Sequence, residues 1–102
     1  MKSFLLLLLL IPVTINDEPI SNDCKCKAIP LYGKVRVVEA FEDFKVRVVD
    51  SFEDLDVDTN VINPDQCGEW EFVNAFEDFT IRYVDAFEDF TIRYVDAFPG
   101  KQ

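Results

Sequence analysis

Residues 75–85 read AFEDFTIRYVD, and residues 86–96 repeat these eleven letters without a change. Related units run through the rest of the chain, with KVRVVEAFEDF at 34–44 and KVRVVDSFEDL at 45–55. A short period of this kind indicates a fold assembled from one small unit used many times. Framed on this pattern, the units begin at Lys34, Lys45, Asp56, Glu69, Thr80 and Thr91.

The apolar residues of a unit favour strands over helices. In KVRVV at 34–38, valines alternate with Lys34 and Arg36, which is the period of a strand. On a helix, the apolar residues of this unit would cover well over half the circle and leave no polar face. Because eleven is odd, a continuous strand would reverse its faces at every repeat. Each unit is therefore predicted to hold one or two short strands, with corners at the Asp–Ala or Asp–Ser step and at the Glu–Asp step.

The centre of the chain divides the units into two halves of three. Pro64 and Gly68 mark a connection there, and the units before it carry K-V-R-V where those after it carry T-I-R-Y. Arginine recurs at one unit position, and like charges directly opposite each other disfavour a simple stack of consecutive units. An interleaved arrangement would instead place arginine beside Glu or Asp. The arginines concerned are Arg36, Arg47, Arg82 and Arg93.

The first fifteen residues, MKSFLLLLLLIPVTI, have the features of a secretory signal peptide. One lysine precedes an apolar run from Phe4 to Ile11, and Pro12 follows. The run is shorter than the roughly 20 residues of a membrane span. We expect cleavage between residues 14 and 23, which would leave a protein without a membrane span, secreted or held in the cell envelope. An uncleaved anchor is the alternative.

If the chain is exported, its cysteines are expected to form a disulfide, because disulfides persist in oxidising compartments. Cys24 and Cys26 lie in an N-terminal segment at 16–30, and Cys67 lies within the repeat domain expected at 31–100. Cys24 and Cys26 are too close in sequence to pair well with each other. We therefore expect either of them to pair with Cys67, which would contribute roughly 3–4 kcal/mol.

Composition excludes several classes of site. The 102 residues contain no histidine and carry a net charge of −10. A Ser-His-Asp triad, a Cys-His pair and a His-ligated zinc are therefore absent, and the acidic balance argues against nucleic acid as a partner.

One acidic stretch is a weak candidate for calcium. Its pattern D-x-D-x-D-x-N resembles the start of an EF-hand loop, although Thr59 replaces the turn glycine and Asp65 stands where glutamate is usual. The alternative is a solvated acidic face of a strand. The candidate ligands are Asp54, Asp56, Asp58 and Asn60.

Two further repeated features are interpreted as structural. The adjacent acids at the corners, such as Glu42 with Asp43 and Glu77 with Asp78, recur too often for a unique catalytic pair. Trp70 stands at a Val/Ile position and is expected to fill space. A row of phenylalanines at one unit position is expected to lie in the core, and comprises Phe41, Phe52, Phe76, Phe87 and Phe98.

Three motifs together resemble the septoil knot domain family. The chain has an L-Y-G-K-V entry at 31–35, a C-G-x-W turn at 67–70 and an F-P-G close at 98–100. Members of that family repeat K-V-x-V-V-D-S-F-P-D-L, and the likeness covers about residues 24–100. The third unit departs from the pattern with Asn60 in place of valine. Glutamate replaces the family's proline at Glu42, Glu53, Glu77 and Glu88.

The resemblance implies a small all-β, repeat-built domain of short strands wound into a deep torus (septoil) knot. In the arrangement we expect, residues 34–68 wind around residues 69–100. The resemblance supplies no established catalytic activity to carry over to this chain, and we expect no cofactor. We expect a monomeric, exported, non-enzymatic structural or protein-interaction domain with high mechanical and proteolytic resistance, whose partner the sequence does not name. The alternatives are an acidic calcium-dependent binding module and a carboxylate-based hydrolase.

Overall fold

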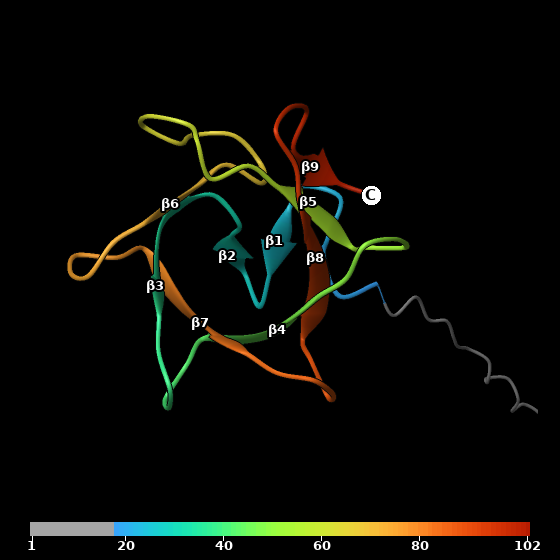
Figure 1. Cartoon of the computed structure of the whole chain (residues 1–102), viewed down its shortest axis with the longest axis horizontal. Helices are drawn as coiled ribbons and strands as arrows, with labels where there is room; N and C mark the ends of the chain where they lie inside the picture. The colour runs from blue at the N-terminus through green and yellow to red at the C-terminus, as the bar shows by residue number, and fades with distance from the viewer. Residues whose placement is uncertain (1–17) are drawn as a thin grey trace, which may run out of the picture.

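A computed structural model describes residues 18–102, and the predicted signal peptide at 1–15 lies outside them. The described residues form short strands and no helix (Figure 1), which confirms the all-β prediction. Within this range, no helix is therefore long and apolar enough to cross a bilayer. The strands are β1 (Lys25–Cys26), β2 (Ile29–Pro30), β3 (Gly33–Val37), β4 (Phe44–Val48), β5 (Leu55–Val57), β6 (Trp70–Phe72), β7 (Phe79–Tyr83), β8 (Phe90–Tyr94) and β9 (Gly100–Lys101).

The two halves of the chain alternate across one seven-stranded sheet. The strand order is β6-β3-β7-β4-β8-β5-β9, so every neighbouring pair joins a strand of the first half to a strand of the second. Neighbours run parallel except β5 and β9, which are antiparallel. The predicted interleaving of the units is confirmed.

Each five-residue strand divides its length between two partners. Val35 in β3 is the last residue to pair with β6 and the first to pair with β7. Val46 has the same double role in β4, between β7 and β8. The pairings are therefore shifted stepwise along the strands, and the sheet curls around the hairpin of β1 and β2 (Figure 1).

The corners between strands explain how an odd period keeps one face inward. The corner at 38–43 contains the predicted Glu–Asp step, with Glu39–Ala40 in place of the predicted Asp–Ala step, and at its tip Phe41 has φ of 60°, in the left-handed region. This break resets the pleat before the next strand begins. As a result Val35 and Val46, eleven residues apart, both have no exposed surface.

Four strands open with a buried aromatic residue, and these rings pack against one another in the core. The Phe79 ring lies edge-on to both Trp70 and Phe44, at centroid distances of 5.5 and 5.4 Å, and Phe44 lies 5.5 Å from Phe90. Trp70 is fully buried, as expected of a space-filling residue, and its indole N–H donates to the carbonyl of Leu31.

The expectation that the corner phenylalanines form the core is wrong. A corner residue with positive φ turns its side chain to solvent. The buried residue three positions later opens a strand at four of these corners, and these residues are Phe44, Leu55, Phe79 and Phe90. The exposed fractions are 101% for Phe41, 97% for Phe52, 92% for Phe76, 94% for Phe87 and 92% for Phe98.

The N-terminal segment is fastened to the sheet. Ile20, Cys24 and Leu31 belong to the same buried cluster as the sheet core. A disulfide joins Cys24 to Cys67 across 43 residues, while Cys26 is a buried free thiol. Burial raises the pKa of the Cys26 thiol, so this side chain acts as a core residue rather than as a reactive thiolate.

Candidate functional site

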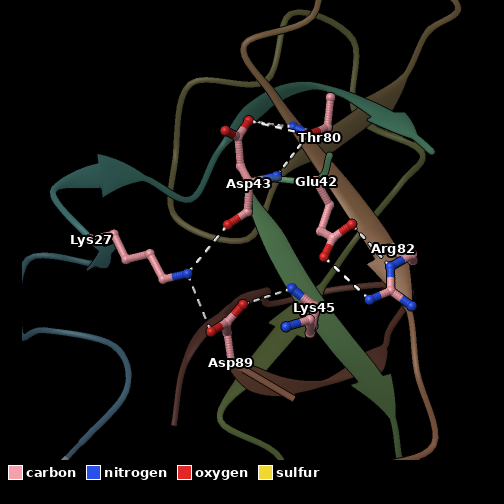
Figure 2. Close-up of polar contacts among 7 residues, drawn as sticks. All are labelled: Lys27, Glu42, Asp43, Lys45, Thr80, Arg82 and Asp89. Atoms are coloured by element: carbon pink, nitrogen blue, oxygen red, sulfur yellow. Dashed lines mark hydrogen bonds and ion pairs between the residues drawn. The ribbon is translucent and has the colours of Figure 1, made fainter. Parts of the chain in front are cut away.

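Figure 2 shows one corner of the first half holding a strand of the second half. Glu42, between β3 and β4, accepts two hydrogen bonds from the guanidinium of Arg82 in β7. Nε lies 2.9 Å from Oε1, and Nη2 lies 3.2 Å from Oε2. A two-point contact of this kind fixes direction as well as distance between the groups.

Asp43, the next residue of this corner, binds the same strand at Thr80, two residues before Arg82. Asp43 Oδ2 accepts from the backbone N–H of Thr80 at 2.9 Å and from its hydroxyl at 3.2 Å. In return, the backbone N–H of Asp43 donates to Thr80 Oγ1 at 2.8 Å. Thr80 is buried, so its hydroxyl has little access to competing water.

Similar contacts recur at other corners within residues 18–102. Each time, a glutamate binds an arginine and the following aspartate accepts from the backbone N–H two residues before that arginine. We call such a corner with its partners an inter-half clasp, because it always joins the two halves of the chain. The other clasps are Glu53–Asp54 with Arg93 and Thr91, Glu77–Asp78 with Arg36 and Lys34, and Glu88–Asp89 with Arg47 and Lys45.

The clasp on β3 depends on a glycine. Asp78 Oδ2 lies 2.8 Å from the backbone N–H of Lys34. A Cβ atom at Gly33 would meet the same oxygen at 2.3 Å, and Gly33 has φ of +121°. The backbone conformation at Gly33 favours glycine, and a side chain there would crowd the Asp78 carboxylate of this clasp.

The N-terminal hairpin also reaches a clasp. Lys27 Nζ lies 3.3 Å from Asp89 Oδ1 and 3.5 Å from the carbonyl oxygen of Asp43 (Figure 2). The other oxygen of Asp89 accepts from the backbone N–H of Lys45 at 2.7 Å. One lysine thus connects the segment before the repeats to corners of both halves.

Ion pairing keeps the clasp glutamates charged. The hydrogen bond from Arg82 lowers the pKa of Glu42, and those from Arg36 and Arg47 lower the pKa values of Glu77 and Glu88. A general acid needs the opposite shift, toward neutral pH. The charged glutamates and their arginines therefore join strands of the two halves.

One carboxyl pair behaves differently. Burial, followed by a hydrogen bond with Glu53, raises the pKa of Asp56 to about 6. The same hydrogen bond helps lower the pKa of Glu53 to about 2. Arg93 Nε lies 3.0 Å from Glu53 and 3.4 Å from Asp56. The pair therefore shares one proton in mildly acidic solution, within a structural contact of the β5–β8 edge.

The calcium candidates do not converge on one point. Asp54 Oδ2 accepts from Thr91, Asp56 lies against Arg93, and Asp58 Oδ1 accepts from the backbone N–H of Asn60. Within residues 18–102, no three acidic or cysteine side chains lie close enough together to hold a metal ion. The alternative of a solvated acidic face is wrong for Asp56 and Asp58, because both are buried by the neighbouring strands.

An open hollow of about 310 Å³ lies beside the clasp at Asp78. One carboxylate lines it, and that group already binds the backbone of Lys34. The hollow therefore offers no acid–base pair. Its lining residues are Ile29, Pro30, Tyr32, Gly33, Pro64 and Asp78.

The corners also expose the phenylalanine side chains expected from the sequence to lie in the core. At every corner that ends in phenylalanine, an acidic residue or Asn74 stands two positions earlier, with Ala or Ser between them. We call these tripeptides the aromatic tips. One signal in the sequence marks them, since each of these phenylalanines follows Ala or Ser and precedes Glu or, at Phe98, proline. The tips are 39–41, 50–52, 74–76, 85–87 and 96–98.

Comparison with known families gives a match over most of the chain. The family model of the 7(1) septoil knot domain matches residues 28–102. The chain belongs to this family. A comparison with curated proteins finds no match.

In this septoil knot domain, the glutamates at the repeat's usual proline position are the clasp residues. Glu42, Glu53, Glu77 and Glu88 each bind an arginine of the opposite half. These ion pairs join the two halves, and the predicted pairing of repeat arginines with acids is confirmed.

Proposed function

We propose that this septoil knot domain is an exported, non-enzymatic and monomeric module that keeps its shape under force and in the presence of proteases. The observation that carries the proposal is the strand order, in which every neighbouring pair joins one half of the chain to the other. We propose further that the halves are wound about each other in the torus knot that the family name describes.

The proposed mechanical resistance follows from the direction in which a pulling force would act on the strands. Pulling the ends apart loads parallel strands along their length, so several backbone hydrogen bonds must break together. The clasps must break as well, because each one crosses the same boundary between halves. A knot adds a constraint that remains after these contacts are lost.

Single-molecule pulling with reduced cysteines tests the knot. An unknotted stretch of residues 18–102 would extend to roughly 280–310 Å. We expect a clearly shorter maximum extension, because the tightened knot retains part of the chain. A disordered chain of equal length is the control. Full extension would overturn the knot and leave the backbone hydrogen bonds and the clasps as the sources of resistance.

Trypsin digestion tests proteolytic resistance. Lys34, Arg36 and Arg47 lie within β3 and β4, where paired strands cannot enter a protease site. We expect these bonds to survive in the folded, oxidised domain and to be cut at once after reduction and denaturation. Rapid cleavage of the folded domain at these positions would refute the proposal.

Export is proposed from the signal-like segment at 1–15, and the Cys24–Cys67 disulfide supports an oxidising destination. Expression in a secreting host followed by N-terminal sequencing tests it. We expect mature protein in the medium or envelope that begins between residues 15 and 24. Full-length protein retained in the cytoplasm with reduced cysteines would contradict export.

A further inference from the structure

The aromatic tips hold phenylalanine where the fold has no use for it. Phe41, Phe52, Phe76, Phe87 and Phe98 have φ between 56° and 61°. This left-handed conformation is unfavourable for a bulky side chain, whereas glycine adopts it without steric strain. Each ring is also almost wholly exposed, so it adds nothing to the core. A strained backbone that carries an exposed aromatic ring points to a role outside the domain.

The negative charge of the tips and of the whole chain indicates which kind of partner the tips would bind. An exposed carboxylate stands two residues before the ring in most tips, namely Glu39, Asp50, Asp85 and Asp96. Residues two apart have Cα atoms within about 7.6 Å of each other. One arginine or lysine side chain is long enough to lie on the ring and to face the carboxylate at the same time. Cations bind aromatic faces, and the net charge of −10 adds long-range attraction.

The arrangement of the tips around the sheet limits further the kind of partner that fits them. Figure 1 shows the corner loops projecting in different directions around the curled sheet. A flat lipid surface would meet only some of the tips, and an anionic one would repel their acids. A second copy of this chain would bring acids against acids. A cationic polypeptide that follows the rim suits both the spread and the charge of the tips.

We propose that the aromatic tips bind Arg- or Lys-rich polypeptides that also carry apolar side chains. Each tip supplies an aromatic face and, at most corners, a carboxylate, and several tips act together on one partner. This inference adds a partner class to the module proposed above. It does not rest on resistance or knotting, so failure of the pulling or trypsin experiments would leave it standing.

Calorimetric titration tests the tips with a synthetic peptide of Arg-Leu-Arg repeats. Each exposed cation–π contact is worth about two- to five-fold in affinity. We expect at least about tenfold weaker binding when all five tip phenylalanines are replaced by glycine, because several contacts are lost together. The Phe87→Gly single variant should show a partial loss, and it keeps the test available if the fivefold variant does not fold. Circular dichroism monitors the strands.

Two controls distinguish binding by the tips from nonspecific hydrophobic binding and from nonspecific binding of peptides. Ile62 is 86% exposed but lies outside the tips, so Ile62→Gly should bind the peptide like the unaltered chain. A peptide with Glu in place of Arg should not bind. Equal binding by the unaltered and the tip-deficient chains would overturn the proposal, as would an equal loss in Ile62→Gly. Flotation on phosphatidylcholine or phosphatidylserine vesicles, or self-association, without peptide binding would also overturn it.

Discussion

Arg36 of β3 and Glu77 of the corner between β6 and β7 form a two-point ion pair across 41 residues of chain. Nε lies 2.9 Å from Oε1, and Nη2 lies 3.0 Å from Oε2. Arg36 is followed eleven residues later by Arg47, which binds Glu88 in the same way. The repeat thus places the same contact at successive steps along the boundary between halves.

The two-point geometry of the Arg36–Glu77 pair should stabilise the fold beyond the attraction between the two charges. We expect Arg36→Lys, which keeps the charge but not the fork, to lower the unfolding midpoint in denaturant. Arg36→Ala should lower it further. The partly exposed pair should lose part of its effect in high salt. A midpoint in Arg36→Lys equal to that of the unaltered chain would show that the fork is unimportant.

Thr80→Val should be destabilising although it preserves shape. The change removes the hydroxyl that joins Asp43 Oδ2 to the backbone N–H of Asp43. A partly buried N–H that loses its partner costs about 1–3 kcal/mol. Thr80→Ser retains the hydroxyl and is the control. Equal free energies of unfolding for the valine and serine variants would contradict the importance of this contact.

The two phenylalanines of one repeat should respond in opposite ways. Phe90 is 1% exposed and its loss to alanine should cost about 3–5 kcal/mol, because it leaves a cavity against Phe44. Phe87 is 94% exposed with φ of 61°, so Phe87→Gly should leave the free energy of unfolding within about 1 kcal/mol of its original value or raise it. A large loss in Phe87→Gly would restore a structural role for the tip.

Asp56 should make stability fall as the pH rises through mildly acidic values. Its pKa in the fold is about 6, above its ordinary value of 3.8, so the folded state binds more protons than the unfolded state between these pH values. The stabilisation that protonation supplies is complete below about pH 4 and is lost by about pH 6. Glu53 has the opposite sign, since its lowered pKa gives stability above its ordinary value of 4.5 that is lost toward pH 2.

Asp56→Asn isolates the first of these effects. Asparagine keeps a hydrogen-bond donor toward Glu53 but does not ionise. The stability of the variant relative to the original chain should therefore rise by about 1–3 kcal/mol between pH 4 and pH 6.5 and then stay level. Denaturant titrations at a series of pH values measure it. A constant difference across this range would show that Asp56 does not titrate as described.

The disulfide should stabilise the fold substantially. Closure of 43 residues between Cys24 and Cys67 corresponds to about 4 kcal/mol in the chain-entropy account. Paired Cys24→Ser and Cys67→Ser changes should lower the free energy of unfolding accordingly. Cys26→Ala should keep the bridge, as mass spectrometry of tryptic peptides would show. A bridge from Cys67 to Cys26 in the original chain would refute the pairing.

Much of the fold could be predicted from periodicity and charge. The eleven-residue unit, its strand character and the arginines set against acids all follow from which residue types alternate and which recur. The pairing of Val35 with both Phe72 and Phe79 could not be predicted, because register depends on residues distant in sequence. The position of the core was misjudged because two phenylalanines per unit, such as Phe87 and Phe90, have the same hydrophobicity.

The site was harder to predict than the fold for a related reason. A side chain at a corner is placed by backbone dihedrals rather than by its affinity for water. The left-handed conformation at Phe41 turns an apolar ring outward, and hydrophobicity alone gives no sign of this. Likewise, Asp56 and Asp58 look like a solvated face in sequence, yet β5 lies between β8 and β9 and is covered.

The alternating strand order constrains how such a chain can lengthen during evolution. In a solenoid each repeat contacts its sequence neighbours, so one unit can be gained or lost without disturbing the others. Here the partners of a strand lie in the opposite half, about 40 residues away. A single added unit would leave one strand unpaired and shift every clasp beyond it. Growth therefore requires matched insertions in both halves of the chain.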